Sequence, residues 1–138
     1  MLESIAPLAT IVILLVWMGF FMLGSLPLMI LKHDTPLDAR FIRGLFDVYY
    51  KAVMVAAALG TLAHALAHRS VTAVGLALVG VVAFASRRFI LTRMDRLRAT
   101  MTVTDTEGIR RFRALHVLGM VLNVAQLVLI CIGLTVAL

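Results

Sequence analysis

Several residue types that stabilise or activate small proteins are scarce in this chain. Its 138 residues include one cysteine, one tryptophan, three prolines and only 14% charged residues. The single cysteine, Cys131, excludes an internal disulfide and any CxxC metal or redox motif. Cys131 lies deep in an apolar run, where we expect the thiol to serve as a small apolar side chain. Paired-cysteine chemistry is therefore excluded.

The abundant residues are apolar, and the charge that is present is mostly positive. The chain is 62% hydrophobic, with a mean hydropathy of +1.05, whereas soluble domains are about half apolar and about a quarter charged. It carries 13 Lys and Arg against seven Asp and Glu, a formal charge of +6. In a soluble protein this excess would indicate nucleic acid, but here the charges lie between apolar runs. We therefore expect a membrane protein that binds no nucleic acid.

Four apolar runs are long enough to cross a bilayer, at about 7–31, 45–67, 71–94 and 109–138. A helix rises 1.5 Å per residue, so about 20 apolar residues cover the roughly 30 Å hydrocarbon layer. The first run lacks a preceding basic residue and a small-residue cleavage site, so we expect it to be a retained helix. The pattern predicts one all-α domain over 1–138, a four-helix transmembrane up-down bundle.

The second span is rich in alanine and contains Gly60, which predicts a slender helix. Small residues let neighbouring backbones approach closely, so this helix should lie centrally and face protein. At its entrance Asp47 precedes Lys51 by four residues, the favourable order for an ion pair on a helix.

Two shorter features lie in the polar segments between the spans. Residues 38–44 are expected to form a short separate helix, with Phe41 and Phe46 among the residues that form its apolar edge in the membrane interface. In the other segment, Thr104 or Thr106 is available to cap the last helix.

The basic residues predict the orientation. Twelve of the 13 lie in the two segments assigned to one side, and Arg69 is alone on the other. The positive-inside rule places these segments in the cytoplasm and both termini on the non-cytoplasmic side of the inner (plasma) membrane. Eight arginines next to the third and fourth spans are expected to anchor the topology and attract anionic lipid headgroups, or to dock a partner. They are Arg87, Arg88, Arg93, Arg96, Arg98, Arg110, Arg111 and Arg113.

Four short fragments, one from each span, carry a family resemblance. They are WMGFFMLGSLP, GLFDVYY, RFILTRMDRLR and FRALHVLGMVLN. In these fragments the chain resembles the DUF4149 family, which includes the TMEM205-like membrane proteins. The resemblance implies a four-span membrane protein, and the family has no established biochemical activity. Members typically carry a serine three residues after the histidine of the last fragment, where this chain has Gly119.

His116, Asn123 and Gln126 form the best candidate site. They are seven and three residues apart, so they share one face of the fourth span. Polar side chains in a span usually face the bundle interior, where they either join helices or line a polar ligand pocket or proton path. Asp95 and the Asp47–Tyr50 segment at the entrance of the second span are candidate partners, because both lie on the same side of the membrane. Trp17 lies well inside the first span, where it either packs against a neighbouring helix or contacts a cofactor.

His64 and His68 suggest a metal site, because imidazoles four residues apart on a helix can bind one ion. Two ligands do not make a site, and the alternative is a pair of interfacial histidines at a helix end. Ser25 and Thr61 are interpreted as hydroxyls bonded to the backbone. No spacing provides a nucleophile, a base and an orienting group, so serine-type catalysis is not expected.

The sequence therefore favours a non-enzymatic protein. We expect an accessory or assembly subunit that packs against other membrane proteins or against itself. The alternative is a membrane protein that binds a small molecule or cofactor, such as haem or quinone, or carries a hydrophobic or metal solute. The sequence does not identify a cofactor.

Overall fold

The computed structural model describes residues 2–32 and 35–137. Within them the chain forms four helices and no strand: α1 (Leu2–Ile30), α2 (Pro36–Leu66), α3 (Ser70–Thr100) and α4 (Thr106–Ala137). The predicted all-α fold is confirmed, with each helix close to one of the predicted spans. Residue 138, the last of the fourth predicted span, lies outside the described residues.

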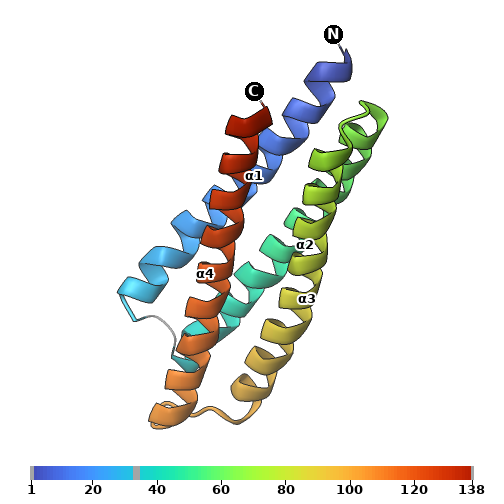
Figure 1. The fold of residues 1–138 in the computed structure, drawn as a ribbon. Coiled ribbons are helices and arrows are strands. Elements are labelled where there is room, and N and C mark those ends of the chain that lie inside the picture. Colours follow the sequence, from blue (N-terminus) through green and yellow to red (C-terminus); the bar gives the residue numbers. More distant parts are fainter. Residues whose placement is uncertain (1, 33–34, 138) are drawn as a thin grey trace.

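The helices form an up-down bundle (Figure 1). Each helix packs against its neighbour in sequence, and α1 also packs against α4, which closes a ring of four. α2 and α4 meet across this ring. Both chain ends and the α2–α3 turn lie at one end of the bundle, and the α1–α2 and α3–α4 connections lie toward the other (Figure 1).

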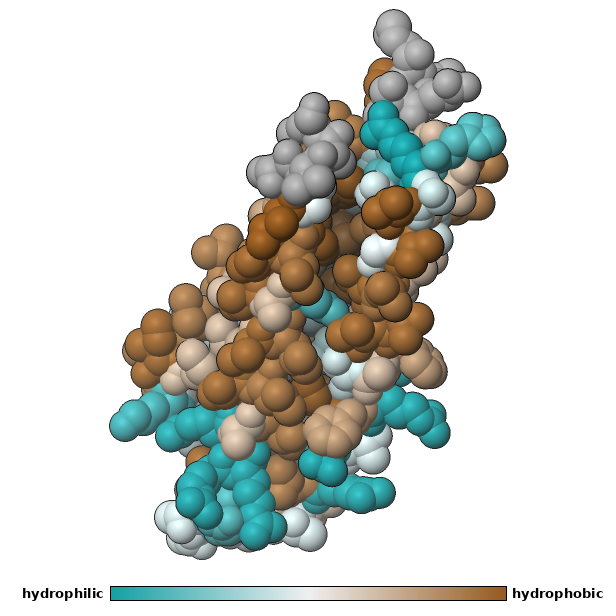
Figure 2. Space-filling view, viewed as in Figure 1, coloured by the Kyte–Doolittle hydropathy of each residue, from teal (hydrophilic) through white to brown (hydrophobic). Residues whose placement is uncertain are grey.

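All four helices are long and apolar enough to cross a membrane, by length and composition. This indicates a multi-pass membrane protein. Figure 2 shows hydrophobic residues over most of the visible surface and hydrophilic residues gathered at the end that carries the α3–α4 connection. We call this end, to which residues 31–32, 35–51 and 87–113 contribute, the basic end.

The bounds of α2 correct one prediction. Residues 38–44 do not form a separate interfacial helix but are the first turns of α2, which runs without interruption from Pro36. Proline suits the first turn of a helix, and no further proline follows in α2 to end it. Ile42 and Phe46, one turn apart, are both fully buried, so this part of α2 packs into the core. Only Phe41 is exposed as predicted.

The cap of α4 also differs from the prediction. The side chain of Asp105, and not a threonine hydroxyl, accepts a hydrogen bond of 2.9 Å from the backbone N–H of Gly108. A carboxylate at this position satisfies a backbone donor that the helix leaves free, and its charge is favourable at a helix N-terminus.

The central position of α2 agrees with the prediction, because α2 contacts each of the other three helices. Its small residues Ala56, Ala57 and Gly60 are buried. A Cβ atom added to Gly60 would lie 3.0 Å from Cδ1 of Leu76 on α3. The absence of a side chain at Gly60 therefore allows the close approach of α2 and α3.

Candidate functional site

A buried hydrogen bond links the last turns of α1 to the first half of α4. Oγ of Ser25 on α1 and Nε2 of His116 on α4 share a hydrogen bond of 2.5 Å, and both residues are fully buried. The ring of Phe46 meets the imidazole edge to face, with 5.6 Å between the ring centroids. The prediction that Ser25 bonds to backbone is therefore wrong, whereas Thr61 does bond to the carbonyl oxygen of Ala57, at 2.8 Å.

Asn123 joins three helices two turns further along α4. The hydroxyl of Tyr49 on α2 donates to its Oδ1 atom at 2.7 Å, and its Nδ2 atom donates to the carbonyl oxygen of Met18 on α1 at 3.3 Å. His116 and Asn123 thus share the inward face, as their spacing predicted. Gln126, one turn beyond, is half-buried and does not join this network within the described part of the chain.

Aromatic rings fill the space around these hydrogen bonds. Phe21 stacks on Tyr49 at a centroid distance of 4.0 Å and meets Phe46 edge to face at 4.8 Å. A Cβ atom added to Gly119 would overlap the Phe46 ring, so the glycine makes room for the phenylalanine. The hydroxyl of Tyr50 is buried and has no hydrogen-bond partner among the described residues.

Asp95 lies in a second polar network, which joins α2 to α3 near the basic end. Arg43 binds the Asp95 carboxylate through two hydrogen bonds of 2.9 and 3.0 Å. Arg87 donates two hydrogen bonds, of 3.1 and 2.6 Å, to one oxygen of Asp47, Oδ1. The predicted pair of Asp47 with Lys51 is present at 2.7 Å. The structure therefore uses Asp95 to hold two helices together, and it does not bring Asp95 to His116.

Trp17 and Cys131 lie on the outer surface. The Trp17 side chain is 37% exposed and meets Phe20 of its own helix edge to face at 5.9 Å. Cys131 is exposed on α4. Neither residue contributes to the buried polar core.

The two histidines of the predicted metal site do not share a helix face. α2 ends at Leu66, and His68 follows in a turn with a φ angle of 57°. His64 is buried, and its Nδ1 atom lies 2.9 Å from the carbonyl oxygen of Gly60, whereas His68 is exposed. The spacing of four residues brings side chains together only while the helix continues. The described residues contain no group of three or more His, Cys, Asp or Glu side chains that could hold a metal ion.

The arrangement of Ser25 and His116 limits its chemistry. A serine hydroxyl bonded to an imidazole is the arrangement of a nucleophile and its base. Here both residues have 0% exposure, so no substrate carbonyl can reach the hydroxyl. The pair therefore serves to hold α1 against α4.

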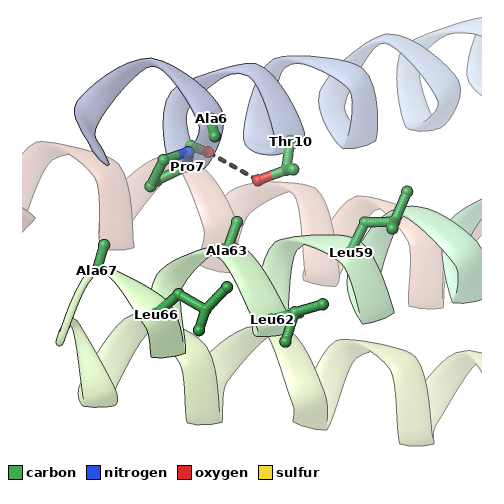
Figure 3. A pocket seen from close by; sticks show the side chains of 8 residues that line it. All are labelled: Ala6, Pro7, Thr10, Leu59, Leu62, Ala63, Leu66 and Ala67. Atoms are coloured by element: carbon green, nitrogen blue, oxygen red, sulfur yellow. Dashed lines mark hydrogen bonds between the residues drawn. The ribbon is translucent and has the colours of Figure 1, made fainter. Parts of the chain in front are cut away.

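Two apolar grooves open on the surface, and neither is lined by the buried polar residues. The first has a volume of about 480 Å³ and lies between α1 and α2 (Figure 3). Its one hydroxyl, on Thr10, donates a hydrogen bond of 2.7 Å to the carbonyl oxygen of Pro7. The second, of about 610 Å³, lies between α2 and α3 and is lined by Met54, Ala57, Ala58, Thr61, Leu62, Ala65, Leu76, Ala77, Gly80, Val81 and Phe84.

Sequence reasoning missed two residues of the polar networks, Ser25 and Arg43. Tyr49 belongs to the Asp47–Tyr50 segment, which was predicted to supply partners for the polar face of the fourth span. Arg43 precedes Asp47 by four residues, a spacing that could have placed it in the ion-pair network. Nothing in the sequence shows which hydroxyl on another helix meets His116 or Asn123.

No family model matches the chain, and no match was found among curated proteins or among solved structures. The resemblance to the DUF4149 family therefore stays a prediction.

Proposed function

We propose that this protein is a non-enzymatic subunit of a membrane assembly, which acts by packing its helices against other membrane proteins or a second copy of itself. The observation that carries the proposal is that the polar groups of the core are used to join helices. Ser25 bonds to His116, and Asn123 bonds to Tyr49 and to the backbone of Met18. Groups engaged in this way support a packing role more than a catalytic one.

The outer surface supports the same proposal. Large apolar side chains cover it, and two open grooves expose small residues such as Ala58 and Ala77. Without a hydrophobic driving force between helices in lipid, small residues at a surface favour close packing of a further helix.

The proposed location is the inner (plasma) membrane, with the basic end in the cytoplasm and both termini outside. Twelve of the 13 basic residues belong to the basic end, and Arg69 lies in the turn at the other. Reporter fusions in the α2–α3 turn and in the α3–α4 connection test this orientation. A cytoplasmic signal from a fusion next to Arg69 would overturn it.

Native gel electrophoresis of gently solubilised protein tests the packing role. We expect a band well above the 15.1 kDa chain mass after correction for detergent. Cysteine cross-linking then locates the contact with the partner protein or the second copy. Cys131 is replaced by serine, and a single cysteine is introduced at Ala77 on α3 or at Ala125 on α4. Both positions are exposed, so they form a matched pair. A solitary monomer with a bound ligand would contradict the proposal.

A second candidate is a membrane protein that binds a small polar molecule or a cofactor. It is favoured by the buried Tyr50 hydroxyl, which has no hydrogen-bond partner among the described residues and which a bound molecule could satisfy. The absorption spectrum, the metal content and the extracted small molecules of the purified protein test this candidate. A stoichiometric haem, quinone or metal would favour it over the packing role.

A further inference from the structure

The arginines in the second half of α3 divide into two sets. Arg87 and Arg98 are half-buried and bound to Asp47 and Asp95, respectively. The second set, Arg88, Arg93 and Arg96, is exposed and has no carboxylate partner among the described residues. In the first set, Arg87 joins α3 to α2 and Arg98 pairs with Asp95 within α3, whereas the second set is available to bind an anion.

The second set lies where α3 leaves its apolar stretch. Residues 71–86 carry no charge and cover about 24 Å, slightly less than the hydrocarbon layer. Arg88 follows two residues later, and Arg96 lies about 12 Å further along the helix axis. Because arginine side chains are long and flexible, all three guanidinium groups can reach the level of the lipid headgroups.

An exposed aromatic ring accompanies these arginines. Phe89 is 45% exposed, and Cζ of Arg93 lies 3.8 Å from the centroid of its ring. The contact fixes the guanidinium group by a cation–π interaction. An aromatic ring beside positive charge at the end of an apolar run is typical of a membrane interface.

We propose that Arg88, Phe89, Arg93 and Arg96 form a binding site for an anionic phospholipid, with the arginines on the phosphate and Phe89 against the upper acyl chain. Guanidinium groups bind phosphate through paired N–H donors. The positive charge of the three arginines favours a lipid with net negative charge over zwitterionic phosphatidylcholine, in which the choline group balances the charge of the phosphate. The inference deepens the proposed function by naming a lipid partner. It rests on the membrane placement of the helices and not on the packing role.

The test measures the relative association constant of a spin-labelled lipid for the protein reconstituted in phosphatidylcholine vesicles. The labelled lipid is phosphatidylglycerol in one experiment and phosphatidylcholine in the other. Two double variants, R88Q/R96Q and R110Q/R111Q, remove the same charge from the same end. Arg110 and Arg111 are also exposed but are bound to Glu107. At low salt each arginine of the site is expected to raise the association constant for phosphatidylglycerol about fivefold. R88Q/R96Q should therefore lower phosphatidylglycerol association about 25-fold, and R110Q/R111Q by less than twofold.

Several outcomes would overturn the site. Equal losses in the two double variants would show only diffuse attraction to the basic end, and no loss in either would show no attraction. Displacement of the labelled lipid by millimolar inorganic phosphate would indicate a site for a free anion. An acidic protein that occupies the site in purified material would replace the lipid as the partner. Circular dichroism of each variant confirms that all four helices are retained.

Discussion

Substitution of Gly119 tests the packing of the core most directly. In Gly119→Ala the new methyl group would overlap the ring of Phe46, which is fully buried. The ring has little room to move, because it also meets Phe21 at 4.8 Å and His116 at 5.6 Å. Overpacking of this kind costs about 1–3 kcal/mol, and the better helix propensity of alanine returns up to about 1 kcal/mol. Because the added methyl group overlaps a buried ring, the overpacking cost lies in the upper part of its range, and we expect a net loss of about 1–2 kcal/mol.

The loss is measured as the free energy of unfolding in a titration of dodecyl maltoside micelles with sodium dodecyl sulfate, followed by circular dichroism. Gly75→Ala on α3 is the control, because an added Cβ atom there meets nothing within 4 Å. Gly119→Ser, which introduces the residue typical of the DUF4149 family, should cost at least as much as alanine. Phe46→Leu should relieve the overlap. The double variant Gly119→Ala/Phe46→Leu should therefore lose less unfolding free energy than the two single variants lose in sum. A Gly119→Ala variant as stable as the unchanged protein would refute the packing described.

The same titration tests the polar networks. A double-mutant cycle of Ser25→Ala and His116→Ala should give a coupling of about 0.6 kcal/mol and no more than about 1.7 kcal/mol, and zero coupling would contradict the shared hydrogen bond. Tyr49→Phe should lower stability by about 1 kcal/mol because its hydroxyl donates to an amide, whereas Tyr50→Phe should leave stability unchanged or raise it; the reverse order would show that the two hydroxyls have exchanged roles. Asp47→Asn should lower stability by about 1 kcal/mol, because this carboxylate ties α2 to α3. That loss should shrink as salt rises, and a loss independent of salt would argue against an ionic origin.

The membrane helices could be predicted because lipid makes the length of an apolar run the dominant signal. The helix bounds could not. Apolar length predicts a second span from residue 45, but α2 begins at Pro36, since a helix continues outside lipid where its buried face and its ion pairs stabilise it. Ile42 and Arg43 show both effects, the first by burial in the core and the second by its bond to Asp95.

The candidate site was predictable within one helix and not between helices. The spacing of His116 and Asn123 places them on one face, and the structure has both facing inward. Their partners depend on how the helices are rotated and staggered against each other, which no spacing within one helix determines. His64 and His68 do not lie together as their spacing predicted, because α2 ends at Leu66, before it reaches His68.

The lengths of α2 and α3 have a mechanical consequence. Each has 31 residues, about 46 Å at 1.5 Å per residue, so each is about 16 Å longer than the hydrocarbon layer is thick. The excess lies at the basic end, where two arginine–aspartate pairs fasten the projecting turns of one helix to those of the other. We therefore expect the projecting turns of α2 and α3 to move together as one rigid body. A force on the α3–α4 connection would then tilt α2 and α3 together relative to the bilayer normal. A protein that binds the basic end would change the tilt of the bundle without separating these two helices.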